Sequence, residues 1–220
     1  MLSRHHGFTI VELLVAMVAG LVVLSGALSL FITVLATGNT NLMLSRLNQE
    51  VQAVGDLISR DLQKAGYHPE AAADLALNRP ISTNSAAHYV FSVADDLYTE
   101  PSTTGSHCLR LKYWDAAQSS GKKPIVRIYS YHRGTQKLTV RTKHNPSDNT
   151  ALSTLCGSGS QLISSKEIKI DQLLFTPIPA GPSSSGASLY MTLSASHARR
   201  PNLIMSLQRH IYLRNEGSSP

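Results

Sequence analysis

The sequence predicts an α+β fold, in which a long N-terminal helix, membrane-spanning in its first half, packs on an antiparallel β-sheet domain. Three observations predict it: Leu13–Gly38 carries no charge, helical spacing continues after it, and the rest alternates β-rich segments with turns. We expect the 220 residues to comprise a short basic N-terminal segment (1–7), a membrane-spanning helix (8–38), an amphipathic helix (39–66) and a β-rich domain (67–220).

The uncharged run of 26 residues at Leu13–Gly38 is long enough for a membrane helix. It spans about 39 Å, against a hydrocarbon layer of about 30 Å. Arg4 precedes it, so the positive-inside rule keeps residues 1–7 in the cytoplasm and exports the chain beyond the span. The alternatives are a secretory signal peptide cut after Ala36, for which the run is too long, and a plain single-span anchor.

Glu12 is the residue that neither alternative explains. A carboxylate in an apolar helix costs about 2.5–3.5 kcal/mol on insertion scales, and such residues usually have a partner. No Lys or Arg lies within two helical turns of it. A cut after Gly7 would supply a cation, because the new α-amine of Phe8 would stand four residues before Glu12.

The segment Gly7–Met17, GFTIVELLVAM, resembles the prepilin cleavage and methylation motif of type IV pilins and type II secretion pseudopilins. The shared features are a short basic leader, Gly, Phe, then Glu five positions into the mature chain, and a long apolar helix. The resemblance implies that prepilin peptidase cuts between Gly7 and Phe8 and methylates the Phe8 amine. It also implies that Glu12 pairs with a neighbouring subunit's amine during assembly and sets the register between subunits.

A second segment, Ser59–Tyr67, reads SRDLQKAGY and resembles the helix end of PilW-type minor pilins and of the related J-type minor pseudopilin of type II secretion. The resemblance implies a low-copy subunit in a tip or priming complex that starts pilus assembly. Many major pilins carry a helix-bending proline where this chain has Ser29. Whether the helix bends near Gly20 or Gly26 therefore stays open.

The resemblance also implies location and partners. The subunit would cross the inner membrane once, with a cytoplasmic N-terminus and a periplasmic domain, and then move to the pilus at the cell surface. Its partners would be prepilin peptidase, the other minor pilins, the major pilin, the inner-membrane assembly platform and, before assembly, the lipid bilayer. Two other roles fit the same residues: a minor pseudopilin of type II secretion, and a DNA-uptake or adhesive tip subunit.

The amphipathic helix presents one apolar stripe. Its members recur every three or four residues and are predicted to face the domain: Leu47, Val51, Val54, Ile58, Leu62 and Ala65. Gly66 is predicted to end the helix, with Pro69 just beyond.

Segments rich in β-branched and aromatic residues dominate the rest of the chain. Seven are predicted strands: His88–Val93, Cys108–Trp114, Pro124–Tyr131, Lys137–Thr142, Glu167–Phe175, Ser188–Ser194 and Leu203–Leu213. Cys108 and Cys156 are the only cysteines, and in an exported domain they are predicted to form a disulfide. The alternative is a pair of buried free thiols.

Basic residues are concentrated in the second half of the chain. Residues 1–107 hold 5 Lys/Arg and 9 Asp/Glu, whereas residues 108–220 hold 15 and 5. Alternation in the hairpin Ile125–Thr142 is predicted to put Val126, Ile128, Leu138 and Val140 on one face. The other face would carry Arg127, Tyr129, Tyr131, Lys137, Thr139 and Arg141. Such a face could bind DNA or another polyanion by charge and stacking, and the alternative is an ordinary solvated face.

Catalytic and cofactor motifs are absent from the sequence. The nine histidines have no metal-ligand spacing, and Asp95-Asp96 and Asp148-Asn149 lack the spacing of a calcium loop. The chain also lacks a nucleophile elbow, a phosphate loop and paired catalytic carboxylates. We therefore expect no enzyme, no metal and no cofactor; the chain is instead expected to be the substrate of an enzyme.

Overall fold

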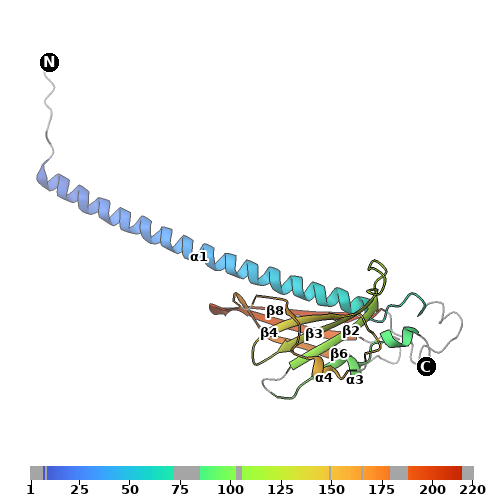
Figure 1. Cartoon of the computed structure of the whole chain (residues 1–220). Helices are drawn as coiled ribbons and strands as arrows, with labels where there is room; N and C mark the ends of the chain where they lie inside the picture. Colours follow the sequence, from blue (N-terminus) through green and yellow to red (C-terminus); the bar gives the residue numbers. More distant parts are fainter. Residues whose placement is uncertain are drawn as a thin grey trace. The chain divides into compact units, whose positions relative to one another are not determined.

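The structure is a computed structural model of the chain that describes residues 7, 9–71, 85–102, 106–148, 150–164, 166–178 and 188–214. It confirms the predicted α+β class, with one long helix and antiparallel sheets (Figure 1). The chain divides into two compact units, residues 1–45 and 46–220, and the boundary between them falls within the long helix.

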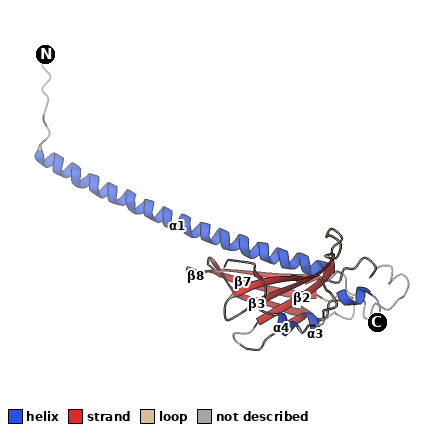
Figure 2. Cartoon of the chain, in the orientation of Figure 1, coloured by secondary structure: helices blue, strands red, loops and turns tan. Residues whose placement is uncertain are grey.

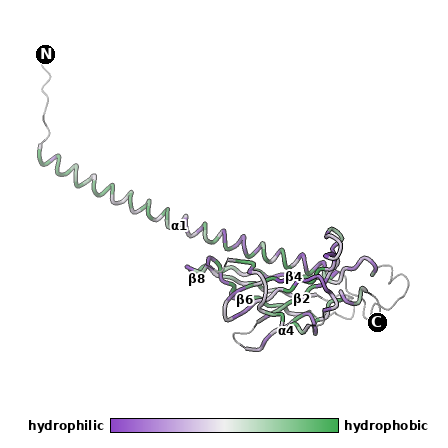
Figure 3. The backbone as a smooth tube through the Cα atoms, viewed as in Figure 1, coloured by the Kyte–Doolittle hydropathy of each residue, from purple (hydrophilic) through white to green (hydrophobic). Residues whose placement is uncertain are grey.

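Helix α1 covers Ile10–Lys64, 55 residues, or about 82 Å of helix. In the first unit its large apolar side chains between Ile10 and Leu35 are 51–82% exposed. Figure 3 shows this stretch as almost uniformly hydrophobic, whereas hydrophilic residues alternate with apolar ones further along α1. The helix is long and apolar enough to cross a membrane by length and composition.

The second half of α1 buries its apolar stripe against the sheets. The six predicted core positions, from Leu47 to Ala65, are at most 5% exposed, which confirms the periodicity argument. Gly55 lies against β8, where an added Cβ would come 2.2 Å from the Leu207 side chain. Gly66 follows the helix with φ near +80°, a conformation that favours glycine, and its N–H donates to the Lys112 carbonyl at 2.9 Å.

A five-stranded antiparallel sheet holds the first strands in sequence order. Its members are β1 (Leu97–Thr99), β2 (Ser106–Trp114), β3 (Pro124–His132), β4 (Lys137–Lys143) and β5 (Ser160–Gln161). The inner face of this sheet, with Leu109, Leu111 and Tyr129, joins the same core as α1. Its outer face carries a smaller core that includes Cys108 and Ile128.

A separate three-stranded sheet contains β6 (Ile168–Ile178), β7 (Ser188–His197) and β8 (Arg200–Tyr212) (Figure 2). The strands therefore form two sheets where the sequence suggested one. The Tyr131 hydroxyl joins them by donating to the carbonyls of Ile170 and Asp171 at 3.1 and 2.8 Å. Inward residues of β6 and β7, such as Leu173 and Met191, complete the core beneath α1.

Short helices cover the five-stranded sheet and its edge: η2 (Ser85–Tyr89), α3 (Val93–Asp96) and α4 (Leu152–Leu155). The predicted strand His88–Val93 is wrong, because its two ends belong to η2 and α3 and residues 90–92 between them form no strand. Ala86 and Tyr89 are both buried at a three-residue spacing, which is a helical rather than an alternating pattern. The predicted disulfide Cys108–Cys156 is present and ties β2 to the end of α4.

Candidate functional site

The start of α1 is built around Thr9 and Glu12. The Leu13 N–H donates to the Thr9 carbonyl at 3.2 Å, which makes Thr9 the N-cap residue. The Glu12 N–H donates to Thr9 Oγ1 at 3.2 Å, and in return the Thr9 N–H and hydroxyl lie 3.4 Å from Glu12 Oε2. This reciprocal arrangement is a capping box, which stabilises the first turn and fixes where the helix begins.

Glu12 lies at the surface of the first unit. Its side chain is exposed, and within the described part of the chain it forms no ion pair. Its position in the first turn suits an anion, because the helix dipole presents its positive end there. The carboxylate is thus oriented by Thr9 but is not neutralised by any cation within the described residues.

Gly7 and Phe8 precede the capping box. Gly7 is exposed, and a Cβ added to it would meet no atom within 4 Å. The packing of the described residues therefore gives no reason for a glycine at position 7. Phe8, the predicted site of methylation, lies outside the described residues.

Asp61 is the second carboxylate within an apolar face of α1, and it has three partners. The Tyr129 hydroxyl donates to Asp61 Oδ2 at 2.6 Å, and the Tyr113 hydroxyl donates to Oδ1 at 3.3 Å. The Arg127 guanidinium lies 3.2 Å from Asp61 Oδ2. Asp61 is only 4% exposed, so this cluster fixes the second half of α1 to the inner face of the five-stranded sheet.

The electrostatics of this cluster follow from burial. Burial, followed by the Asp61 charge, raises the pKa of Tyr113 to about 12 and raises that of Tyr129 in the same direction. Burial alone would lower the pKa of Arg127, but Asp61 and the tyrosines outweigh it and raise that pKa. The cluster therefore holds two neutral phenols, one carboxylate and one guanidinium, arranged to support the fold.

The basic–aromatic hairpin face predicted from alternation is wrong. The turn between β3 and β4 has four residues and pairs His132 with Lys137, so even-numbered residues of β3 face odd-numbered residues of β4. Alternation alone places even-numbered residues opposite even-numbered ones. A register shift of one residue moves a whole strand's side chains to the opposite face.

The corrected register disperses the five proposed polyanion ligands. Tyr129 and Tyr131 are buried in the core, and Arg127 faces Asp61 on the same side. Lys137 and Arg141 belong to the opposite face, where the Arg141 guanidinium donates to Ser158 Oγ at 2.9 Å. These residues share no exposed surface for a polyanion to bind.

The sequence analysis did not identify Thr9 or Asp61 as residues of functional interest. Thr9 was detectable, because a Thr followed three residues later by Glu before an apolar run is the signature of a capping box. Asp61 falls within the SRDLQKAGY segment but carried no signal of its partners. Tyr113, Arg127 and Tyr129 come from strands more than fifty residues further along, and only the folded register brings them to Asp61.

Comparison with known families is consistent with this geometry. The family described as prepilin peptidase-dependent protein B matches residues 40–213, which take in the second half of α1 and both sheets. The prokaryotic N-terminal methylation motif matches residues 2–28, which contain Gly7, Phe8 and Glu12. No curated protein and no solved structure matches the chain. Because the first match covers most of its length, the chain belongs to the prepilin peptidase-dependent protein B family and opens with a prepilin-type N-terminal methylation motif.

Proposed function

We propose that the chain is a minor subunit of a type IV pilus, cut by prepilin peptidase between Gly7 and Phe8 and methylated at the Phe8 amine. It would enter the filament at low copy, in a tip or priming complex that starts assembly. The observation that carries the proposal is the exposed Glu12 carboxylate, held by Thr9 at the start of an apolar helix within a matched methylation motif.

Glu12 supplies the step that links processing to assembly. In a bilayer an unpaired carboxylate is costly, and insertion scales give about 2.5–3.5 kcal/mol. The Phe8 amine exists only after the cut, so only a processed neighbour offers a cation to Glu12. Pairing the two charges would draw the subunit from lipid into the filament and set its axial register.

The family and the apolar half of α1 fit a membrane-anchored pilin-like subunit. We place the N-terminus in the cytoplasm, because Arg4 precedes the span, and the β-rich domain in the periplasm. The Cys108–Cys156 disulfide agrees with an oxidising compartment. The proposed partners are the peptidase, the major and other minor pilins and the assembly platform.

The test is intact mass and N-terminal sequencing of the protein from cells with and without prepilin peptidase. We expect a mature chain that begins at methylated Phe8 only when the peptidase is present. Gly7→Val should leave the uncut precursor, because the proposed peptidase needs a small residue before the cut. A Cβ at position 7 meets no described atom within 4 Å, so we do not expect the substitution to disturb the described fold. A cut after Ala36, or an unchanged N-terminus in peptidase-containing cells, would contradict the proposal.

A minor pseudopilin of type II secretion is the second candidate. The SRDLQKAGY end of α1 favours it as much as the pilus, because both subunit types share that resemblance. Deleting the gene separates them: loss of surface pili supports the pilus subunit, and loss of protein secretion with pili retained supports the pseudopilin. A DNA-binding tip role based on the hairpin is not proposed, because its residues do not share a face.

A further inference from the structure

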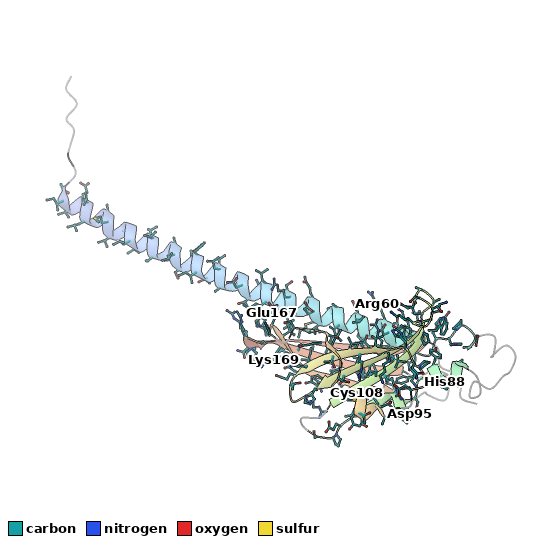
Figure 4. All side chains as sticks on the ribbon, in the orientation of Figure 1. Arg60, His88, Asp95, Cys108, Glu167 and Lys169 are labelled. Atoms are coloured by element: carbon teal, nitrogen blue, oxygen red, sulfur yellow. A yellow bond between two sulfur atoms is a disulfide. The ribbon has the colours of Figure 1, made fainter. Side chains whose placement is uncertain are left out.

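Basic side chains gather at the end of the globular unit that holds Arg46, its first residue. Arg46 Nη1 lies 3.7 Å from Glu167 Oε2, and the Glu167 carbonyl accepts a hydrogen bond from the Ala198 N–H at 2.7 Å. Lys169 pairs with Ser196 one step along the sheet. We name this group the basic rim: Arg46, Lys166, Lys169 and Arg199. Figure 4 places Glu167 and Lys169 at this end of the unit and His88 at the other.

The basic rim is exposed and only partly neutralised. Within the described residues, Arg46 pairs with Glu167, and this pair is open to solvent, with side chains 72% and 62% exposed. Such a pair contributes little to stability and is easily exchanged for another partner. Asp171, the next acidic residue along the chain, accepts hydrogen bonds from Ser196 and Gln136. Among the residues that the structure describes, Lys166, Lys169 and Arg199 form no ion pair, so their charges are available to an external anion.

The covalent path bounds the distance from the rim to the membrane. Arg46 is eight residues beyond Gly38, the end of the uncharged run, and eight helical residues span about 12 Å. The headgroup layer occupies roughly 5–8 Å of that distance. The distance left between Arg46 and the headgroup layer is comparable to the screening length of about 8 Å at physiological salt. Because the path runs along the helix, it is an upper limit at any angle of the helix to the bilayer.

We propose that the basic rim docks the globular unit on anionic lipid headgroups of the membrane that holds α1, before the subunit enters a filament. The proposal rests on the membrane anchoring in the proposed function. Lys and Arg near an anionic surface are each attracted to it, and the attraction falls within a screening length. The lipid surface is the one polyanion that the chain itself keeps within reach, so it is the occupant that the geometry favours.

The experiment uses the full precursor in vesicles of phosphatidylcholine, with or without 30% phosphatidylglycerol, and a trace of acceptor-labelled lipid headgroup. A donor dye is attached at Ser164→Cys, an exposed site near the basic rim. A second sample carries the dye at Ser119→Cys, in the β2–β3 loop beyond Trp114, whose N–H donates to the Tyr67 carbonyl at the other end of the helix. We expect energy transfer at position 164 to rise about twofold with the anionic lipid and to fall back in 0.5 M salt, with little change at position 119.

Charge reversal provides the matched control. The triple variant Lys166→Glu, Lys169→Glu, Arg199→Glu should lose the lipid-dependent rise, whereas Lys122→Glu with Lys123→Glu should keep it. Glu167→Gln should enlarge the rise. Equal energy transfer from position 164 in neutral and anionic vesicles would overturn the proposal. An equal loss of the lipid-dependent rise in both charge-reversal variants would also overturn it. So would a rise that appears only after other subunits are added. Cleavage at Gly7 is read separately by mass, so failed docking with normal cleavage rejects the docking alone.

Discussion

The two halves of α1 each carry one carboxylate within an apolar face, and the structure treats them in opposite ways. In the first half the apolar side chains are exposed and Glu12 is held only by its neighbour Thr9. In the second half the apolar stripe is buried and Asp61 is enclosed by Tyr113, Tyr129 and Arg127.

The difference supports a division in which Asp61 serves the fold and, as we propose, Glu12 serves assembly. Asp61 finds all its partners inside the subunit, so removing it should damage the subunit itself. Glu12 finds a helix cap but no cation among the described residues, so removing it should leave the domain intact and affect only what happens between subunits. Substitutions at the two carboxylates and at their partners test this division, beginning with the largest expected effect.

Glu12→Val should nearly abolish incorporation into filaments, at least a tenfold loss, while cleavage after Gly7 and the stability of the globular unit stay unchanged. The physical reason is that the variant has no charge to pair with a neighbour's amine. The measurement is the amount of the subunit in sheared filaments relative to the membrane pool. Glu50→Gln, at an exposed position in the second half of α1, is the control and should incorporate normally. Normal filament entry by Glu12→Val would remove the role assigned to this carboxylate.

Asp61→Asn should lower the free energy of unfolding by about 3–5 kcal/mol, because it leaves the partly buried Arg127 guanidinium without its counter-charge. Denaturant unfolding of the mature chain in detergent measures the change. Asp56→Asn is the matched control, since Asp56 pairs with Arg209 at a half-exposed site and should change stability by less than about 1 kcal/mol. Equal effects of the two substitutions would mean that burial of the Asp61 cluster does not govern its contribution.

The same cluster predicts loss of stability at high pH. Burial and the Asp61 charge raise the pKa of Tyr113 from 10.0 to about 12, so the phenol stays neutral in the fold when the unfolded chain has begun to ionise. Its contribution is therefore present below pH 10 and is lost as pH rises from 10 to 12, by about 3 kcal/mol in all. The free energy of unfolding, measured at several pH values across this range, should fall more steeply with pH for the native chain than for Tyr113→Phe. Identical pH profiles would show that Tyr113 is not held neutral by the fold.

Local periodicity was enough to predict the helix and its buried face. Every position assigned to the amphipathic stripe, Leu47 through Ala65, lies in the core, because the 3.6-residue repeat depends only on neighbours along the chain. The positive-φ stop at Gly66 was predictable for the same reason. The disulfide was also predictable, since two cysteines in a domain that the sequence predicts to be exported leave a single pairing.

Features that depend on pairing between distant segments were not predictable. Strand alternation alone did not reveal whether the even-numbered residues of β3 lie on the same face as the even-numbered or the odd-numbered residues of β4. The length of the turn after His132 decides this register. The partners of Asp61 depend on that same register, so the buried cluster was mistaken for an exposed basic surface. The segment His88–Val93 failed because its apolar residues fit a short helical turn as well as a strand.

The capping box gives the smallest and most local prediction. Thr9→Val removes the hydroxyl that accepts the Glu12 N–H and should destabilise the first turn of α1 by about 1 kcal/mol, whereas Thr9→Ser keeps that acceptor and should be nearly neutral. Amide exchange of the first turn in detergent measures the change. If Thr9 also orients Glu12 for its neighbour, Thr9→Val should reduce filament entry in proportion to this fraying, and Thr9→Ser should not. Fraying without loss of incorporation would mean that Thr9 stabilises only the start of the helix. Glu12 would then pair with its neighbour without help from Thr9, whereas Asp61 is held by three partners within its own subunit.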